Sequence, residues 1–413
     1  VSRPRRPEAG LQVQSRQIRG LRRLVYFLLE ILFWGSLSLV AYTYALYPLL
    51  ILRLGKAASR NDVAPSPLGN EALPSVTVIV AAYNEEIHIA ARIQNLLQQD
   101  YPPERMKIIV GSDGSTDRTV AIAQQYLDAR LHVLAFPVNR GKASVLNDCV
   151  AQAASEILVF TDANTVFRPD TVRMLVSALD DSTAATCGDL IMAPPHQGQN
   201  VDHQYWSIER RLKAAESAIG GLIGANGGVY AIRRAHYGPL RPDTIVDDFV
   251  IAMNIGVAGH GIKYVPAAVA FEDTPGDIIE EYYRRVRIGI GNYQALFRHP
   301  QYLFAGPWAL RFTYLSHKVL RWLTPHLLVC ALASSVALIY FDRDYAFVAA
   351  IEVLGYSGAA LVFFTRQSVS WPKLFVAGMF FAVLNWAFLV GFKRYLFADY
   401  RGSWRRTART RLP

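Results

Sequence analysis

Four long apolar runs, one near the start of the chain and three near its end, constrain this sequence more than any other feature. The first covers residues 24–54, and the later three cover about 319–341, 345–365 and 374–397. Each run has the ~20 residues that a helix needs to cross the hydrocarbon core of a bilayer. Tyr, Trp and Phe at the edges of the runs are typical of membrane interfaces. The sequence therefore predicts an integral membrane protein with a polar body between its membrane segments.

The composition agrees with membrane segments joined to a globular body. Of the 413 residues, 52% are hydrophobic and only 18% are charged, whereas soluble domains average about 25% charged residues. The first apolar run is too long for a signal peptide, and no small-residue cleavage site follows it. Three scattered cysteines do not form a disulfide framework, and no CxxC or His/Cys pattern indicates zinc.

The net charge of +10 comes largely from the two ends of the chain, where arginines cluster within residues 3–23 and again within 401–411. Basic residues that flank apolar spans commonly face lipid headgroups on the cytoplasmic side. We therefore expect a lipid bilayer as a partner and no nucleic acid.

The body between the apolar runs alternates strand and helix patterns. Near-continuous apolar stretches rich in β-branched residues predict strands, and longer stretches between them predict helices. The expected strands cover residues 75–82, 107–111, 131–135 and 156–161, and the expected helices cover 86–98, a segment from about 117, and 141–154. This order predicts an α/β domain whose parallel sheet is covered by helices on both faces.

Polar side chains follow three of these strands, at the edge where a parallel sheet binds its ligands. They are Asn84 with Glu85, Asp113, and Asp162 with Asn164. Asp162 and Asn164 offer two oxygen ligands one residue apart, which suits a hard cation such as Mg²⁺ or Mn²⁺. No GxGxxG follows the first strand, and RGKAS lacks the first glycine of a P-loop, so both of these nucleotide motifs are excluded.

Two later segments, 202–217 and 277–298, repeat apolar residues every three or four positions. The second also carries a separate polar stripe formed by Arg284, Arg287, Gly291, Gln294 and Arg298. Such amphipathic helices either pack against a core or lie in the membrane interface, and the pattern leaves both interpretations open.

Seven short motifs follow one another between the apolar ends: AYNEE, SDGSTD, RGKA, TDAN, GANGGVYAIRR, VDD and RRVRI. In this order they resemble the membrane-integrated family 2 glycosyltransferases, the group that includes the hyaluronan, chitin-oligosaccharide, cellulose and poly-N-acetylglucosamine synthases. The resemblance covers roughly residues 73–298 and the flanking spans. It implies a GT-A fold, which is a Rossmann-like α/β nucleotide-sugar domain. It also implies inverting, metal-dependent transfer of a sugar from a nucleoside diphosphate, expected to be UDP, to a glycan or glycolipid acceptor.

The resemblance assigns expected roles to individual residues. The metal positions are Asp162 and Asn164, with Mg²⁺ or Mn²⁺ as the cofactor, and Asn164 replaces the second acid of the family's DxD motif. The expected nucleotide-binding residues are Tyr83, Glu85, Asp113, Lys142, Arg284 and Arg287. The expected acceptor-side residues are Asp189, Asn226 and Gly228.

Asp248 matches the position of the catalytic base, which takes the proton of the acceptor hydroxyl, and Asp247 is its expected neighbour. A positioned base of this kind contributes about 10²–10⁴-fold to a rate. A purely structural alternative makes Asp247 and Asp248 a pair of helix N-caps, and the same kind of interpretation makes Asp117 an Asx turn or helix cap.

The motif RRVRI departs from the QxxRW of processive synthases, because Arg284 replaces Gln and Ile288 replaces Trp. Arg287 keeps the arginine expected to hold the diphosphate. Two alternatives therefore stay open beside a single-transfer enzyme. One is a processive polysaccharide synthase that also translocates its polymer, and the other is a catalytically retired, membrane-anchored nucleotide-binding protein.

The predicted organisation follows from the apolar runs and the resemblance together. It comprises a basic segment (1–23), a transmembrane helix (24–54), a linker (55–73), a GT-A domain (74–276), interfacial helices (277–318), three apolar membrane segments (319–397) and a basic tail (398–413).

Because nucleotide sugars are cytosolic, the body is expected on the cytosolic face of a bacterial-type inner or plasma membrane. One span before the body and three after it would place both basic ends outside, against the positive-inside tendency. Either one run does not cross the membrane, or basic residues nearer the body set the orientation.

Overall fold

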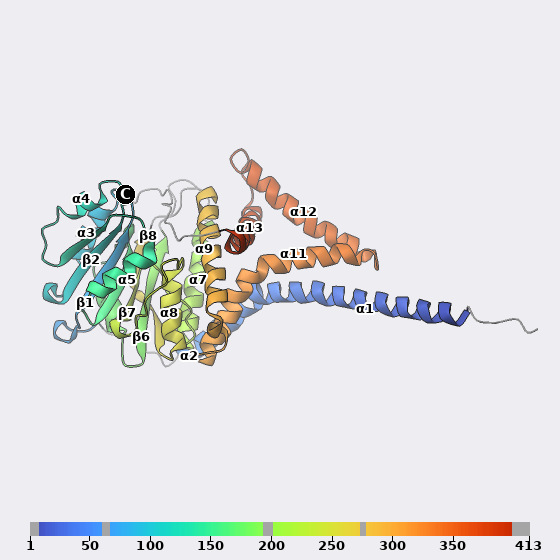
Figure 1. The fold of residues 1–413 in the computed structure, drawn as a ribbon, viewed down its shortest axis with the longest axis horizontal. Helices are drawn as coiled ribbons and strands as arrows, with labels where there is room; N and C mark the ends of the chain where they lie inside the picture. The colour runs from blue at the N-terminus through green and yellow to red at the C-terminus, as the bar shows by residue number, and fades with distance from the viewer. Residues whose placement is uncertain (1–7, 60–66, 193–200, 273–277, 399–413) are drawn as a thin grey trace, which may run out of the picture. The chain divides into compact units, whose positions relative to one another are not determined.

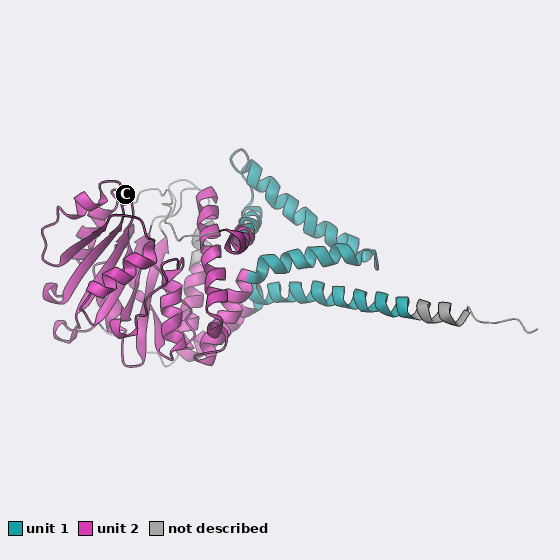
Figure 2. Ribbon diagram, in the orientation of Figure 1, with its two compact units in different colours: residues 1–46, 323–386 teal, residues 47–322, 387–413 magenta. Residues whose placement is uncertain are grey.

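The computed structural model describes residues 8–59, 67–192, 201–272 and 278–398, with the side chains of 8–16 and 201–206 left out (Figure 1). The chain divides into two compact units (Figure 2). Unit 1 comprises Val1–Leu46 and Leu323–Trp386, and unit 2 comprises Tyr47–Trp322 and Ala387–Pro413.

Unit 2 is built on an eight-stranded sheet of order β3-β2-β1-β4-β7-β6-β8-β5. The four strands expected from the sequence are present and parallel to one another. They are β1 (Val76–Ala82), β2 (Met106–Asp113), β3 (Leu131–Phe136) and β4 (Ile157–Asp162). Every side chain of β1 is buried, which requires helices on both faces of the sheet.

The other half of the sheet makes it mixed rather than wholly parallel as expected. Its strands are β5 (Thr165–Phe167), β6 (Thr183–Met192), β7 (Tyr230–Arg233) and β8 (Gly261–Glu272). Strand β7 is antiparallel to both β4 and β6, and β5 is antiparallel to β8.

The helices of unit 2 follow the expected pattern. Those after the first strands are α3 (Ile89–Leu97), α4 (Thr119–Ala123), α5 (Lys142–Gln152) and α6 (Thr171–Ser177), and the later ones are α7 (Val201–Ala218), α8 (Asp247–Val257) and α9 (Ile278–Arg298). The central residues of α9 are buried, so core packing accounts for its amphipathic pattern there. Short 3₁₀ turns cover Asn70–Ala72, Pro103–Arg105, Arg234–His236 and Pro300–Leu303.

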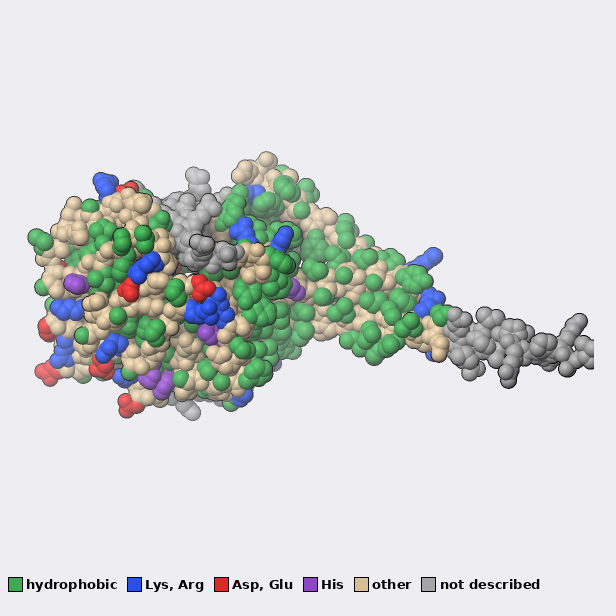
Figure 3. Space-filling model, in the orientation of Figure 1, with side chains coloured by type: hydrophobic (Ala, Val, Ile, Leu, Met, Phe, Trp, Pro, Cys, Tyr) green, Lys and Arg blue, Asp and Glu red, His purple; other side chains and the backbone are tan. Residues whose placement is uncertain are grey.

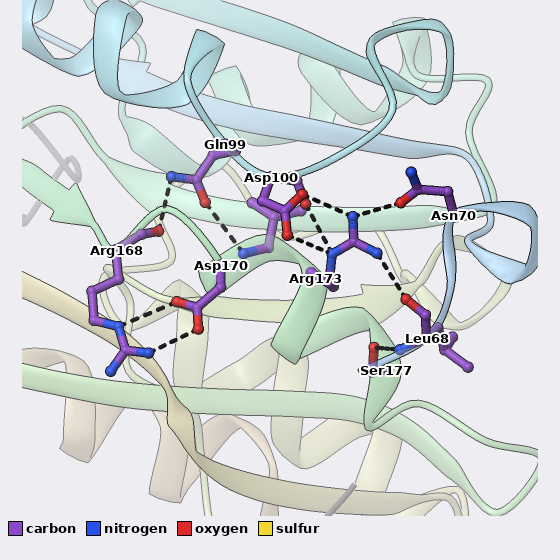
Figure 4. Close-up of polar contacts among 9 residues, drawn as sticks. Leu68, Asn70, Gln99, Asp100, Arg168, Asp170, Arg173 and Ser177 are labelled. Carbon is purple, nitrogen blue, oxygen red and sulfur yellow. Dashed lines mark hydrogen bonds and ion pairs between the residues drawn. The ribbon is translucent and has the colours of Figure 1, made fainter. Parts of the chain in front are cut away.

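The segment just before β1 is fixed to the α/β domain. The guanidinium of Arg173, on α6, donates to the carbonyl of Leu68 at 2.7 Å and to Asn70 Oδ1 at 2.8 Å, and it pairs with Asp100 at 2.9 Å (Figure 4). The end of the expected linker is therefore a docked part of the domain.

Among the described residues, four helical stretches are long and apolar enough to cross a membrane: Gln17–Ala58, Trp308–Leu338, Asp344–Thr365 and Lys373–Phe397. The first contains α1 (Glu8–Ala41), a π-helix (Tyr42–Leu46) and α2 (Tyr47–Ala58), and the second contains α10 (Trp308–Thr313), a π-helix (Tyr314–Val319) and α11 (Leu320–Leu338). The last two are α12 (Asp344–Thr365) and α13 (Lys373–Phe397).

The first long helix extends beyond the expected span and ends inside unit 2. A Cβ added to Gly55 of α2 would lie 2.5 Å from the Cα of Ala215 on α7, so the two backbones touch. In unit 1 the helices instead expose large apolar side chains such as Leu354 and Phe364, and hydrophobic side chains dominate their surface in Figure 3. Exposed apolar surface of this extent is typical of membrane contact.

Candidate active site

The loops after β1 and β2 are joined by hydrogen bonds. Asn84 adopts a positive φ of 54°, and its Oδ1 accepts from the Thr116 backbone N–H at 2.8 Å. The backbone N–H of Glu86 donates to Asp117 Oδ2 at 3.1 Å, and Asp117 Oδ1 accepts from the N–H of Thr119 at 2.9 Å. The interpretation of Asp117 as an Asx turn is confirmed. Asn84 joins the two loops, a role that becomes visible only in the folded structure.

The two residues expected at the nucleotide base lie in the first of these loops. Tyr83 is half-buried. The Glu85 carboxylate lies 2.8 Å from His88 Nδ1, and its backbone N–H donates to Thr119 Oγ1 at 2.8 Å. Glu85 is thus held between the start of α3 and the neighbouring loop.

Asp113 ends β2 and holds the loop that precedes α5. Its carboxylate is fully buried and accepts from the backbone N–H groups of Arg140 at 2.8 Å and Gly141 at 2.9 Å. Gly141 has φ of 92°, a conformation that favours glycine. These contacts place Lys142, the first residue of α5, at the carboxyl edge of the sheet.

Lys142 brings together two of the expected acidic motifs. Its Nζ lies 2.9 Å from Asp162 Oδ1, at the end of β4, and 3.3 Å from Asp247 Oδ2, at the start of α8. Burial by itself would lower the pKa of Lys142, but Asp162 and Asp247 outweigh it and raise the pKa above its usual value. The lysine is therefore charged, and it links motifs that lie more than 80 positions apart in the sequence.

Asp247 and Asp248 occupy the first turn of α8, so the helix-capping interpretation is only partly right. Val246 is the N-cap residue, and Phe249 donates its N–H to Asp248 Oδ1 at 2.8 Å. Asp247 is 5% exposed, and the 3.3 Å contact of its Oδ2 with Lys142 Nζ is an ion pair without hydrogen-bond geometry. Burial, and then the charge of Asp247, raise the pKa of Asp248 to about 6. A carboxylate with such a pKa is a stronger base than an ordinary aspartate and is still ionised at neutral pH.

The GANGG segment lies against this acid. A Cβ added to Gly227 would lie 3.2 Å from Asp248 Oδ2. We expect Gly227→Ala to displace the carboxylate and lower kcat roughly tenfold, because a misplacement of about 1 Å can cost 10²-fold. Gly238→Ala is the matched control, since its Cβ would meet no atom within 4 Å. A folded Gly227→Ala enzyme with unchanged kcat would contradict this placement.

Asn164 follows Asp162 in the turn between β4 and β5. Its Nδ2 lies 3.4 Å from Glu272 Oε1, and Glu272 is brought there because it pairs with Thr165 in the β5–β8 ladder. The sequence analysis did not identify Glu272, since this contact depends on a strand pairing between residues over 100 positions apart.

The expected acceptor residues are largely occupied by contacts within the protein. Asp189 accepts from the Tyr264 hydroxyl at 2.7 Å and pairs with Arg210 at 3.1 Å. Asn226 donates to the Gly188 carbonyl at 2.7 Å and accepts from Lys213.

Gly228 is also occupied by contacts within the protein. Its carbonyl accepts from Thr161 Oγ1 at 2.7 Å, and a Cβ at this position would lie 2.8 Å from Thr165 Oγ1. These contacts show a structural role for Asp189, Asn226 and Gly228, and contact with an acceptor stays a prediction.

The polar stripe of α9 packs against the segment that leads into Asp247 and Asp248. Gln294 Oε1 accepts from the N–H of Ile245 at 3.2 Å, Arg298 pairs with Asp243, and a Cβ on Gly291 would lie 2.8 Å from Val246 Cγ1.

The two expected arginines precede these contacts along the stripe. Residues three and four apart share a helix face, so Arg287 lies on the face that carries Gly291, one turn earlier. Arg284 lies a further turn away and pairs with Glu281 at 3.3 Å.

Comparisons with known proteins agree with this architecture. Residues 77–237 match the family model Glycosyl transferase family 2. An N-acetylglucosaminyltransferase of Rhizobium meliloti is 24% identical over 283 residues, which are 63% of this chain and 65% of that protein. A poly-beta-1,6-N-acetyl-D-glucosamine synthase of Staphylococcus epidermidis is 26% identical over 240 residues, 55% of this chain and 57% of that one. The matched region thus spans less than two thirds of either relative.

A solved structure shares the fold over most of the chain. It is a mannosyltransferase from Pyrobaculum calidifontis in complex with GDP-Man and Mn²⁺, with a TM-score of 0.69 and 24% identity over 89% of this chain and 99% of that one. The GT-A fold expected from the motifs is confirmed. The motif order and the matching family model together identify residues 77–237 as a family 2 glycosyltransferase domain.

Proposed function

We propose that this protein transfers a sugar from a nucleoside diphosphate donor to a glycan or glycolipid acceptor at a membrane. We assign UDP as the nucleoside diphosphate. The observation that carries the proposal is the cluster in which Lys142 lies between Asp162 and Asp247, beside Asp248, at the carboxyl edge of the sheet. Ligands of open α/β sheets bind at this edge. The names of the relatives support polysaccharide biosynthesis as the setting.

The transfer we propose inverts the anomeric carbon. Asp248 takes the proton of the acceptor hydroxyl, whose oxygen forms a bond to the anomeric carbon while the bond from that carbon to the diphosphate breaks on the opposite side. Lys142 and Arg287 offer positive charge to the departing diphosphate, which preorganised cations stabilise strongly. Asp247 holds Lys142 in place through its ion pair.

The residues at the strand edge also fit a divalent cation. No three His, Cys, Asp or Glu side chains of the described chain form a complete metal shell. Mg²⁺ in nucleotide sites is commonly held by one or two carboxylates together with substrate phosphates and water. Asp162 and Asn164 fit that incomplete set, and we assign Mg²⁺ or Mn²⁺ to them. When bound, the ion supplies further charge stabilisation of the diphosphate.

A screen of nucleotide sugars tests this proposal. We expect the detergent-solubilised protein, with Mn²⁺ and membrane lipid or oligosaccharide acceptors, to release nucleoside diphosphate from a UDP-sugar, and mass analysis to find the matching glycosylated product. The absence of turnover across the panel, with tight UDP binding by calorimetry, would instead support the retired nucleotide-binding protein.

A processive polysaccharide synthase is the second candidate, and the polymer synthases among the relatives favour it. Ile288 in place of the aromatic residue expected of processive members argues against it. Product length separates the two: a long polymer made by the purified chain alone would establish processive synthesis, and addition of one sugar would establish single transfer.

We further propose that the catalytic domain faces the cytosol of a bacterial-type inner or plasma membrane. The four candidate spans support membrane integration, and the cytosolic supply of nucleotide sugars supports this orientation.

A further inference from the structure

A buried cation lies behind the turn that carries Asp162 and Asn164. Arg92, on α3, is 1% exposed and sits in a stripe that otherwise consists of the apolar residues Ile89, Ile93 and Leu96. No carboxylate of the described chain lies within ion-pairing distance of its guanidinium, and its Nε has no hydrogen-bond partner there. Burial therefore lowers the pKa of Arg92 to about 9, although the charge of Asp162 partly offsets this effect. A leucine or methionine would fill the same stripe without the cost of burying a charge.

The guanidinium contacts both ends of the segment that holds the expected metal ligands. Arg92 Nη2 donates to Thr161 Oγ1 at 2.6 Å, directly before Asp162. The guanidinium carbon also lies 4.1 Å from the ring centre of Phe167, the last residue of β5. Residues 162–166 are therefore bracketed by two contacts to one side chain.

Asn95, one turn further along α3, strengthens this bracket. Its Oδ1 accepts from Arg92 Nη1 at 2.6 Å and from the Phe167 N–H at 2.8 Å, and its Nδ2 donates to the Phe167 carbonyl at 2.8 Å. The side chain of Asn95 thus satisfies the backbone of Phe167 as a neighbouring strand would.

Arg92 acts from the face of the sheet opposite to the nucleotide cluster. Successive side chains of a strand point to opposite faces. Thr161 contacts Arg92 on α3, whereas Asp162 contacts Lys142 on α5. The arginine can therefore fix the position of Asp162 without touching a donor bound on the other face.

We propose that Arg92 is a positioning residue that holds the Asp162–Asn164 turn in the geometry needed to bind a divalent cation and a diphosphate. The metal in this inference rests on the proposed function, whereas the contacts of Arg92 with Thr161 and Phe167 are observed in the fold. In this role Arg92 does not touch the substrate, unlike the residues of the nucleotide cluster.

The test compares Arg92→Met and Arg92→Lys with a matched control, Arg173→Met. Arg173 is also buried and also holds loop groups, but its partners are Asp100, Leu68 and Asn70, which are not part of the metal turn (Figure 4). Hydrogen exchange of the full chain in detergent is the first readout. We expect Arg92→Met to speed exchange of the amides of residues 162–167 at least tenfold. Arg173→Met should lower Tm without this local change.

The second readout is Mn²⁺ binding in the presence of UDP, measured by electron paramagnetic resonance. We expect Arg92→Met to weaken it roughly tenfold and Arg92→Lys to weaken it less, because lysine keeps the charge but not the two-pronged contact. Thr161→Val removes the acceptor of Arg92 and should reproduce the local exchange even if Arg92→Met does not fold.

Three results separate the inference from the function on which it rests. Unchanged exchange in residues 162–167 of folded Arg92→Met would overturn the positioning role, as would an equal effect of Arg173→Met on Mn²⁺ binding. If Arg92→Met speeds the local exchange but the wild-type protein binds no Mn²⁺ in the presence of UDP, the positioning role is supported and the proposed function is contradicted.

Discussion

Replacing Asp248 with Asn is expected to lower kcat by about 10²–10⁴-fold, because the amide cannot take the proton of the attacking hydroxyl. The substitution keeps the shape and the oxygen that accepts from Phe249 N–H at 2.8 Å, so Tm and donor binding should change little. Release of nucleoside diphosphate with acceptor present measures the effect. Asp128→Asn is the control, since Asp128 pairs with Arg130 in the segment before β3. An Asp248→Asn enzyme that turns over at the wild-type rate would remove Asp248 from the mechanism.

The pH dependence gives a second check on the same residue. The raised pKa of Asp248, about 6, means that the carboxyl is protonated, and unable to act as a base, below that pH. Wild-type kcat/KM, which reports the pKa values of the free enzyme, should therefore fall as the pH drops through about 6, and the residual activity of Asp248→Asn should lack this limb. The opposite slope, with activity rising toward acid, would contradict the assignment of a carboxylate base.

Replacing Asp162 with Ala is expected to lower turnover by about 10²–10³-fold, the loss typical of removing one group that stabilises developing charge. It removes a proposed metal ligand and the partner that lies 2.9 Å from Lys142 Nζ. The Mn²⁺ concentration for half-maximal activity should rise as well. Asp162→Asn should lose less turnover than Asp162→Ala, because an amide oxygen remains available as a metal ligand, as in Asn164.

The comparison of these two Asp162 variants identifies the role of the carboxylate. Partial recovery of Asp162→Asn, but not of Asp162→Ala, at high Mn²⁺ is the expected pattern. Equal activities for both variants at every Mn²⁺ concentration would contradict a role in metal binding and leave Asp162 only as the partner of Lys142.

The sequence alone could predict which edge of the sheet gathers the candidate site residues, because this edge is built from parallel strands whose ends are marked by polar residues. Asp113 and Asp162 each end a near-continuous apolar stretch, and the structure places both residues at strand ends. The ion pairs that join Lys142 to Asp162 and Asp247 followed only from the fold, because they connect three different elements.

Two strands in the second half of the sheet could not be predicted from local pattern. Strand β5 has three residues and β7 has four, which is too short for alternation to be recognised. Glu272 reaches Asn164 through the pairing of β5 with β8. The motif pattern also did not distinguish residues that face a ligand from residues that hold a loop, and Asp113 and Asn226 are shown by their hydrogen bonds to hold loops.

The boundaries of the membrane helices show a similar limit. Hydropathy located the apolar runs, but it could not show that α2 packs on α7 at Gly55 and Ala215. Small residues at such a contact look like ordinary members of an apolar stretch until the partner helix is known.

A crystal structure of the chain with Mn²⁺ and UDP, with data collected at the manganese absorption edge, tests the central claim most directly. The account predicts an anomalous peak beside Asp162 and Asn164, with the diphosphate next to Lys142 and the Asp248 carboxylate open to the acceptor side. A manganese peak and a nucleotide bound elsewhere, with Lys142 still paired with both Asp162 and Asp247, would contradict the account.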